Sequence, residues 1–443
     1  MIRLCSSVVS ALCLALLVGS AAIGAPVPAN DDKAGKFDWP QWRGPQRDGI
    51  SKETGLLKEW PKDGPPLAWK VKGLGGGFSA PAIAGGRIFG MSYRGADEVV
   101  WALDAKDGSE KWVTRIDPAA KNIGGPGMGE EGSRCMPTVD GDLVYALGTS
   151  GDLVCLKAAD GKEVWHKNLK TDFGGRAMAR WAYCESPLID GDKLICTPGG
   201  KDATVVALNK KTGETVWKAQ VPDGNGAGYA SPIAIEAAGH RQYVHFLEGG
   251  LAGFDSATGK LLWSFKKGAN RVANCSMPLF FDDCVFVSSA YGAGGALVKL
   301  SKDGADGVKA EEVYATNKLQ NHHGGVILHD GCLYGANGGN EGGFLICLDA
   351  KTGAVKWDAR DGRKAPKGSL TMADGRLYYR HEDGTMTLLE PSAKEYIERG
   401  RFAQPERTRS PDWRHPVIAN GKLYLRDQDL LLCYDVKDHK LGQ

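Results

Sequence analysis

Long apolar runs are almost absent from this 443-residue sequence, and the one that is present lies at the N-terminus. Leu12 to Ile23 is almost wholly apolar, follows the basic start MIR and precedes a series of small residues. This layout is typical of a cleaved secretory signal, and the apolar run is shorter than a membrane-spanning helix needs. We therefore expect a signal peptide at 1–25 and an exported protein, periplasmic or secreted, with no membrane span. Cys5 and Cys13 lie before or inside the run, so neither is placed as a lipoprotein cysteine.

The sequence also carries little net charge. Its 55 Lys and Arg residues are interspersed with 53 Asp and Glu residues, which leaves a formal charge of +2. A chain without a region of concentrated positive charge has little electrostatic attraction for nucleic acid or for an anionic membrane surface. We therefore expect no nucleic-acid partner.

Several motifs of catalysis and metal binding are missing as well. The chain has no Walker loop, HExxH helix or Ser–His–Asp order, and it has no CxxC or zinc-type pair of cysteine pairs. Many cysteines lie in apolar strand-like runs such as FLICLD, which favours buried free thiols, with a disulfide framework as the alternative. Because their number beyond the signal is odd, at least one must stay unpaired. These nine are Cys135, Cys155, Cys184, Cys196, Cys275, Cys284, Cys332, Cys347 and Cys433.

What the sequence has is 61 glycines and a ten-residue phrase that recurs five times. The residue eight before its final Trp is Asp or Asn in four copies and Lys157 in the other. Asp or Asn there can hydrogen-bond amides two residues on, and a Gly supplies the positive φ of a reversal. Each phrase therefore predicts a strand, a tight turn and a second strand whose Trp packs into a neighbouring unit. The copies are LDAKDGSEKW (103–112), LKAADGKEVW (156–165), LNKKTGETVW (208–217), FDSATGKLLW (254–263) and LDAKTGAVKW (348–357).

Upstream of each phrase lies a Pro-containing segment, a glycine turn and an alternating strand, so each unit reads as four short antiparallel strands. Such units are typical of propeller blades. The units begin near residues 79, 134, 185, 230, 275, 322, 368 and 415.

The eighth unit offers only three strands, the last of which is LLLCYDV (430–436), and PLAWKVKG (66–73) is an orphan strand with the expected Trp. We therefore predict an all-β fold, an eight-bladed β-propeller over 66–443 that closes by pairing these N- and C-terminal strands. The seventh unit, LLEPSAKEYIERGRF, lacks the Gly turn and the Trp. A seven-bladed ring is the alternative.

The phrases resemble the tryptophan-docking repeat Ala-x-Asp-x-x-Thr-Gly-x-x-x-Trp of the PQQ-like, quinoprotein-type β-propellers. The leader DWPQWRGPQRDGIS (38–51) is similar to that of exported PQQ-like repeat proteins of planctomycete-type bacteria. The resemblance implies that the Trp residues that end the phrases dock neighbouring blades. They are Trp112, Trp165, Trp217, Trp263 and Trp357.

Members of this family include pyrroloquinoline-quinone-dependent alcohol dehydrogenases and an outer-membrane assembly lipoprotein that has no cofactor. The dehydrogenases use a vicinal Cys pair, a calcium ion held by Glu, Asn and Asp, and an Asp base. This sequence has no adjacent cysteines and lacks the long inserts that roof the quinone. We therefore predict no cofactor and favour a protein that is not an enzyme. Quinone and calcium remain the cofactors that the family resemblance implies for the enzymatic alternative.

The loops that precede the innermost strand of each blade are rich in Gly and polar residues, and they should converge into one pocket. Arg together with Trp suits a planar or anionic ligand. Ion pairs for the arginines and packing between blades for the Trp are the alternatives. Neighbours in a strand point to opposite faces, so of His322 and His323 only one should enter the channel, and no metal site is predicted. The candidate ligand-facing residues are Arg134, Arg180, Trp181, Glu185, Arg271, Asn321 and His322.

The N-terminal leader, 26–65, contains WPQWRG (39–44), which we expect to cap one mouth of the ring or to dock a partner. The sequence thus predicts a binding or scaffold propeller that holds a protein partner or small-molecule ligand at the axial channel mouth. The alternatives are an alcohol-dehydrogenase-like oxidoreductase and a carbohydrate-binding propeller.

Overall fold

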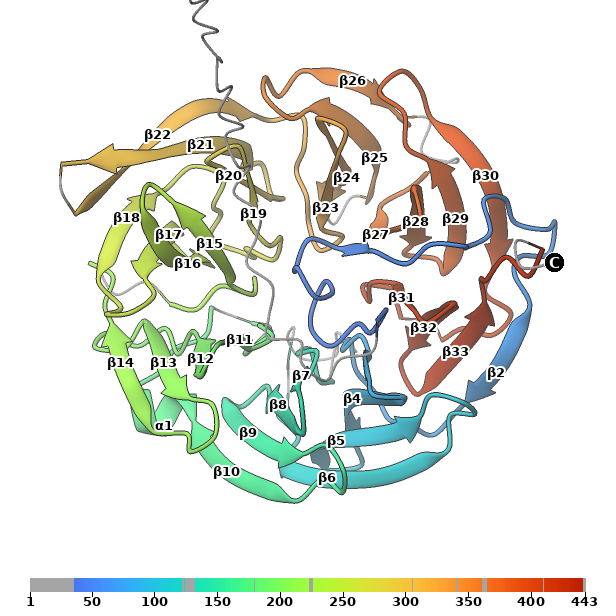
Figure 1. Cartoon of the computed structure of the whole chain (residues 1–443), viewed down its shortest axis with the longest axis horizontal. Coiled ribbons are helices and arrows are strands. Elements are labelled where there is room, and N and C mark those ends of the chain that lie inside the picture. Colours follow the sequence, from blue (N-terminus) through green and yellow to red (C-terminus); the bar gives the residue numbers. More distant parts are fainter. Residues whose placement is uncertain are drawn as a thin grey trace, which may run out of the picture.

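Eight separate β-sheets are arranged radially around one axis in the computed structural model (Figure 1). The eight-bladed prediction is confirmed, and the seven-bladed alternative is excluded. The structure describes residues 36–121, 123, 132–178, 180–222, 226–304, 306–339, 342–360, 365–408 and 410–440. The expected signal peptide, 1–25, lies outside these residues. Within them, no helix is long and apolar enough to cross a membrane.

The first four blades each contain four antiparallel strands, and one short helix follows the second. Blade 1 has β3 (Ala82–Ala84), β4 (Arg87–Arg94), β5 (Asp97–Asp104) and β6 (Glu110–Pro118). Blade 2 has β7 (Thr138–Asp140), β8 (Leu143–Leu147), β9 (Asp152–Lys157) and β10 (Glu163–Asn168), followed by α1 (Leu169–Phe173). Blade 3 has β11 (Leu188–Asp190), β12 (Lys193–Cys196), β13 (Val205–Asn209) and β14 (Thr215–Ala219). Blade 4 has β15 (Ile233–Ala237), β16 (His240–Leu247), β17 (Gly250–Asp255) and β18 (Leu261–Phe265).

The remaining blades complete the ring. Blade 5 has β19 (Leu279–Phe281), β20 (Cys284–Ser289), β21 (Gly294–Asp303) and β22 (Gly307–Thr316). Blade 6 has β23 (Val326–His329), β24 (Cys332–Gly339), β25 (Gly342–Asp349) and β26 (Val355–Asp358). Blade 7 has β27 (Gly368–Ala373), β28 (Arg376–His381), β29 (Thr385–Glu390) and β30 (Ile397–Ala403). Blade 8 has β31 (Val417–Ala419), β32 (Lys422–Asp427), β33 (Leu430–Asp435) and, from the other end of the chain, β2 (Leu67–Val71).

The repeated phrase forms the turn between the third and fourth strands of a blade. In blade 1, Asp104 Oδ1 accepts a hydrogen bond from the amide of Lys106 at 2.9 Å, and Gly108 adopts φ 76°. In blade 3, Asn209 Oδ1 accepts from the amide of Lys211 at 2.9 Å. The turn therefore forms in the way that its Asp or Asn and its Gly predict.

Each phrase-ending Trp lies opposite a small residue of its own blade, and four of the five donate a hydrogen bond to the turn of the next blade. Trp165 pairs across the sheet with Cys155, and its indole Nε1 donates to the carbonyl of Lys210 in blade 3 at 2.9 Å. Trp112, Trp217 and Trp357 donate in the same way to the turns of the following blades. Trp263 instead donates to Gln242 of its own blade, because the long β21–β22 hairpin replaces the next turn.

Several cysteines lie opposite a docking Trp on the adjacent strand, and this position explains why their side chains are small. Cys347 pairs with Trp357 and Cys433 pairs with Trp69, where a larger side chain would displace the indole ring. The nine cysteines of the described residues are free thiols, and all but Cys184 and Cys275 are buried. Most of them therefore behave as small apolar residues.

The two ends of the propeller meet in blade 8. Strand β2 pairs antiparallel with β33, with Leu67 opposite Tyr434 and Val71 opposite Leu431. This confirms the predicted closure by the N- and C-terminal strands. A closed ring leaves no gap between the first and last blades, so neither presents an open face to solvent.

Residues 38–60, which we call the strap, cross the centre of the ring (blue in Figure 1). Asp38 accepts from the amide of Gly85 in the β3–β4 turn, and the Leu56 amide donates to Asp374 in the β27–β28 turn. The strap therefore lies at the end of the ring opposite the loops that precede the innermost strands. Its short strand β1 (Ile50–Ser51) adds in parallel to β27. Blade 7 thus has five strands, whereas four antiparallel strands were expected.

Trp60 of the strap occupies the place of the Trp that blade 7 lacks. The register puts Gly400 where other blades have the docking Trp, and a Cβ on Gly400 would lie 2.6 Å from the Cβ of Trp60. The Trp60 ring packs edge-on against Tyr378 and Phe402, with centroids 5.7 and 5.2 Å away. A residue far away in sequence therefore completes the weakest repeat.

Replacing Trp60 by Ala should lower the free energy of unfolding by about 3–5 kcal/mol, because it empties a buried aromatic site in blade 7. Urea unfolding followed by far-UV circular dichroism measures the change. Leu67→Ala, at a position that is 41% exposed on β2, is the control and should cost less than about 1 kcal/mol. Equal costs for the two variants would contradict the assignment.

Candidate functional site

A cavity of about 570 Å³ lies at the axial mouth of the ring, at the end where the loops before the innermost strands meet. The strap contacts the β3–β4 and β27–β28 turns at the other end. The loops that precede the innermost strands of all eight blades contribute to its wall, and Trp42 of the strap reaches it from the opposite end. Its lining is mostly aromatic and cationic. The principal lining residues are Trp42, Phe78, Arg134, Arg180, Trp181, Cys184, Tyr229, Cys275, Tyr291, His322, His323, Lys367, Glu382 and Trp413.

Four of the seven candidate residues lie together on this wall: Arg134, Arg180, Trp181 and His322. The other three do not belong to the lining. Glu185 and Asn321 are buried beside it, at 2% and 0% exposure, and Arg271 is exposed outside it.

Both His322 and His323 line the cavity, so the expectation that only one would enter the channel is wrong. Strand β23 begins at Val326, so the two residues lie in a loop and need not alternate. Their rings are 5.2 Å apart, at an interplanar angle of 62°.

Sequence reasoning missed several lining residues, among them Tyr291, Lys367, Glu382 and Trp413. Lys367 and Trp413 precede the innermost strands of blades 7 and 8, where the argument from the mouth loops applies equally. Tyr291 and Glu382 lie in the turns between second and third strands. In an antiparallel blade these turns reach the same end as the mouth loops.

A chain of polar side chains runs along one wall. Tyr291 Oη lies 3.0 Å from His322 Nε2, and Lys367 Nζ lies 3.4 Å from His322 Nδ1. Glu382 Oε1 accepts from His323 Nε2 and Trp413 Nε1, both at 2.8 Å, and lies 3.1 Å from Lys367 Nζ. Because an ammonium group only donates, His322 Nδ1 accepts from Lys367, and its Nε2 proton points at Tyr291 Oη.

The protonation states on this wall follow from burial and hydrogen bonding. Burial, with the nearby charges of His323 and Lys367, lowers the pKa of His322 to about 2. Burial also lowers the pKa of His323, against the opposing effect of Glu382. Burial would raise the pKa of Glu382, but hydrogen bonding and charge from His323 and Lys367 outweigh it and bring the pKa to about 2. At neutral pH the wall therefore holds two neutral imidazoles and an ionised carboxylate.

Three residues other than glycine near the cavity adopt left-handed backbone angles. Arg180, Ala182 and Tyr291 have φ of 72°, 61° and 57°. Such conformations cost about 1–3 kcal/mol each and are retained where the surroundings impose them. Two of these three residues contribute side chains to the cavity wall, which marks the wall as a functional candidate.

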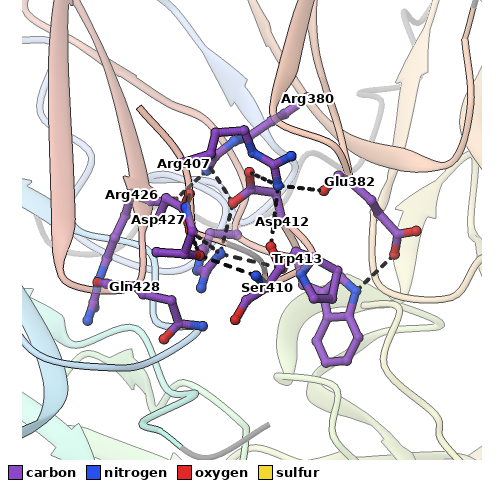
Figure 2. A network of polar contacts seen from close by, with 12 residues as sticks. Arg380, Glu382, Arg407, Ser410, Asp412, Trp413, Arg426, Asp427 and Gln428 are labelled. Carbon is purple, nitrogen blue, oxygen red and sulfur yellow. Dashed lines mark hydrogen bonds and ion pairs between the residues drawn. The ribbon is translucent and has the colours of Figure 1, made fainter. Parts of the chain in front are cut away.

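A buried ionic network supports the wall from behind (Figure 2). Asp412 contacts Arg380 at 3.0 Å and Arg414 at 2.8 Å, and all three side chains are fully buried. Trp413, between Asp412 and Arg414 in the chain, stacks on Phe78 with centroids 5.0 Å apart. The ion pairs therefore fix the loop that presents Trp413 to the cavity.

Arg426 ties this network across the seam between blades 8 and 1. Its guanidinium donates to the carbonyls of Ser79 and Met91 and to the hydroxyl of Ser92, at 3.0, 2.6 and 2.8 Å. It also lies over the Trp101 ring at 5.4 Å. One side chain thus satisfies three acceptors of the neighbouring blade.

The variant Arg426→Met should destabilise the protein by at least about 3 kcal/mol, because buried acceptors of blade 1 lose their donor. The midpoint of urea unfolding measures this change. Arg115→Met, which removes an ion pair with Asp97 on the exposed face of blade 1, should cost less than about 1 kcal/mol. A similar midpoint shift in both variants would show that the seam does not depend on Arg426.

Glu185 belongs to a deeper polar layer that the strap completes. Its carboxylate accepts from the amide and the hydroxyl of Thr197, and Thr197 Oγ1 lies 2.9 Å from His245 Nδ1. Arg47 of the strap donates to the carbonyls of Pro187 and Pro232 in the same layer. Burial raises the pKa of Glu185 to about 7, although Thr197 and Arg47 oppose the shift.

Glu185 should therefore make the protein more stable at pH 5 than at pH 8. An acid whose pKa is raised on folding stabilises the native state at low pH, and this stabilisation is lost as the pH rises through the native value. Relative to Glu185→Gln, the wild type should lose on the order of 2–3 kcal/mol between pH 5 and pH 8. Chemical unfolding at both pH values gives the difference. The exposed Glu395→Gln serves as the control, and parallel profiles for wild type and Glu185→Gln would refute the assignment.

Comparison with known proteins places this chain among propellers of the same repeat. A family model described as outer membrane protein assembly factor BamB matches residues 51–180 and 113–359. The chain belongs to this PQQ-like repeat family. It is 34% identical over 101 residues to BamB of Salmonella typhimurium, covering 22% of this chain and 24% of that protein. It is 26% identical over 148 residues to quinohemoprotein alcohol dehydrogenase ADH IIB of Pseudomonas putida, covering 30% and 20%.

These alignments span less than a quarter of the length of either relative. The solved structures extend the likeness over the whole ring. BamB from Moraxella catarrhalis superposes with a TM-score of 0.59 at 16% identity, over 84% of this chain and 98% of that one. The quinohemoprotein alcohol dehydrogenase ADHIIG from Pseudomonas putida HK5 gives 0.59 at 13% identity, over 94% and 83%. At such identities the likeness concerns the fold alone.

The calcium and cysteine chemistry of the family's dehydrogenases does not fit this cavity. No group of three or more His, Cys, Asp and Glu side chains among the described residues is placed to hold a metal ion. Glu382 is the one carboxylate in the described lining, and its Oε1 already has three donors around it. Cys184 and Cys275 come from separate loops and carry free thiols. The aromatic and cationic walls suit a planar anion, but the described lining offers no further carboxylate to hold calcium beside it.

Proposed function

We propose that the protein is an exported binding protein that holds a ring-containing organic anion in the cavity at the axial mouth, without redox turnover. A periplasmic or secreted location is part of the proposal and rests on the N-terminal segment. The observation that carries the binding site is the charge of the cavity wall. The described residues of its lining include three cationic side chains, Arg134, Arg180 and Lys367, and one carboxylate, Glu382.

Arg180 makes the strongest case for an anionic ligand. It is exposed, it lines the cavity, and it makes no hydrogen bond or ion pair with any described residue. The fold nevertheless holds it at φ 72°. A guanidinium presented in this way is ready to form charge-assisted hydrogen bonds with a carboxylate or a similar anion.

The aromatic residues of the cavity wall support the proposal that the ligand contains a ring. Trp42, Trp181 and Trp413 reach the cavity from the strap and from blades 3 and 8. The guanidinium groups of Arg134 and Arg414 each lie over the Phe78 ring, 4.8 Å from its centroid. Flat apolar faces beside cations bind a ring that carries negative charge. The volume of about 570 Å³ is in the range of small-molecule sites.

A second candidate function is a scaffold for a protein partner. It is supported by the family match to proteins named as outer membrane protein assembly factors. On this view the cavity would receive an acidic side chain or terminus of the partner. The small-molecule proposal has priority because the wall encloses a volume suited to a small ligand.

Quenching of tryptophan fluorescence tests the binding proposal, since three Trp residues line the cavity. Benzene tricarboxylate and oligogalacturonate are the anionic probes, and benzyl alcohol and maltotriose are the neutral ones. At least one anionic probe should bind, and Arg180→Gln should weaken it about tenfold by removing charge-assisted hydrogen bonds. Arg115→Gln on the outer face of blade 1 is the matched control. Binding of neutral and anionic probes alike, unaffected by Arg180→Gln, would refute the proposal.

A further inference from the structure

Two charged groups on the cavity wall, the Arg180 guanidinium and the Glu382 Oε2 atom, have no hydrogen-bond or ion-pair partner among the described residues. Glu382 Oε1 is engaged by His323, Trp413 and Lys367, whereas Glu382 Oε2 has no hydrogen-bond or ion-pair partner among the described residues. The Glu382 side chain is 26% exposed and lines the cavity. Its second oxygen is therefore the one available to a ligand.

This carboxylate is ionised and held in place. Three donors fix the position of Oε1, and the pKa of about 2 keeps the group charged over the physiological range. An ionised carboxylate oxygen that faces a small cavity favours a ligand group that donates a proton. It repels a ligand that presents only anionic oxygens at that place.

Arg180 and Glu382 do not pair with each other, although they share one cavity. A ligand that satisfies both must carry an anionic group for Arg180 and, at a different position, a hydroxyl or amine donor for Glu382. A positively charged amine is disfavoured by Lys367, 3.1 Å from Glu382. The remaining donor is a neutral hydroxyl.

The aromatic residues of the wall indicate what kind of molecule carries the anionic group and the hydroxyl. Trp413 donates its indole N–H to Glu382, so its ring borders the carboxylate directly. Trp181 lies beside Arg180 in the chain and also lines the cavity. The wall thus places an aromatic ring against Glu382 and a second one in the loop that carries Arg180. Sugar rings match this pattern, because their C–H faces pack on aromatic rings while their hydroxyls point outward at the edges.

From this arrangement we infer that the ligand is an acidic saccharide, whose carboxylate binds Arg180 and whose hydroxyls bind Glu382 Oε2. This inference rests on the proposed anion-binding function and narrows it. A planar polycarboxylate can pair with Arg180 but has no hydroxyl that donates to Glu382 Oε2. An uncharged sugar meets the requirement of Glu382 but leaves Arg180 without a partner.

Titration calorimetry of the full mature chain with oligogalacturonate, maltotriose and benzene tricarboxylate tests the inference. Oligogalacturonate should bind at least tenfold more tightly than either of the others. Equal or tighter binding of benzene tricarboxylate would overturn the saccharide inference and leave the anion-binding function standing. Failure of both anions to bind would overturn both.

Two variants separate the roles of the two groups. Arg180→Gln should weaken oligogalacturonate and benzene tricarboxylate by similar factors, about tenfold, because both ligands use the cation. Glu382→Gln can keep its carbonyl oxygen toward His323, Trp413 and Lys367, and it then places an amide N–H₂ where Oε2 was. It should weaken oligogalacturonate about tenfold but leave benzene tricarboxylate unchanged or tighter.

Opposite responses of the two ligands to one substitution cannot come from a general loss of structure. Thermal unfolding of both variants checks that the fold persists, and Glu395→Gln on the exposed surface is the carboxylate control. If Glu382→Gln weakens both ligands equally while the melting temperature is kept, Glu382 does not select for hydroxyls, and the inference is wrong. A sulfated oligosaccharide in the same titration distinguishes a carboxylate from a sulfate as the anionic group.

Discussion

Closure of the ring is the constraint on which the rest of the structure depends. Blade 8 obtains its fourth strand when β2 pairs with β33, and Arg426 joins this blade to blade 1 through buried hydrogen bonds. The ends of the propeller are separated by more than 350 residues of sequence, so their pairing fixes a very long loop. Every mouth loop takes its position from this closed frame, and the cavity needs all eight of them.

The strap links closure to the cavity. It enters where the hairpins turn, supplies Trp60 to blade 7, and carries Trp42 through the centre to the opposite end. Arg47 fills the channel between these points and donates to carbonyls of the inner strands. The strap therefore contacts the end of the ring opposite the cavity, and the cationic and aromatic residues gather at the other end.

The sequence allowed the repeated part of the fold to be predicted, because each phrase encodes its own turn. Asp104, Gly108 and Trp112 act within one hairpin or on the next blade, so local rules suffice. The local rules did not apply to blade 7, because its docking Trp, Trp60, comes from the strap. The local sequence has only Gly400 at the corresponding position. The candidate site was predicted in part, through Arg180 and Trp181. Glu382 was missed because a turn carboxylate becomes informative only when its neighbours His323 and Lys367 are known.

The character of the site follows from which polar groups are left without partners. The fully buried Asp412 is paired with Arg380 and Arg414, because an unpaired buried charge is costly. In contrast, the Arg180 guanidinium and Glu382 Oε2 have no partner among the described residues, and both residues line the cavity, where solvent or a ligand can reach them. A wall that offers cations, one acceptor and several aromatic faces supports the proposal that this cavity binds a charged sugar.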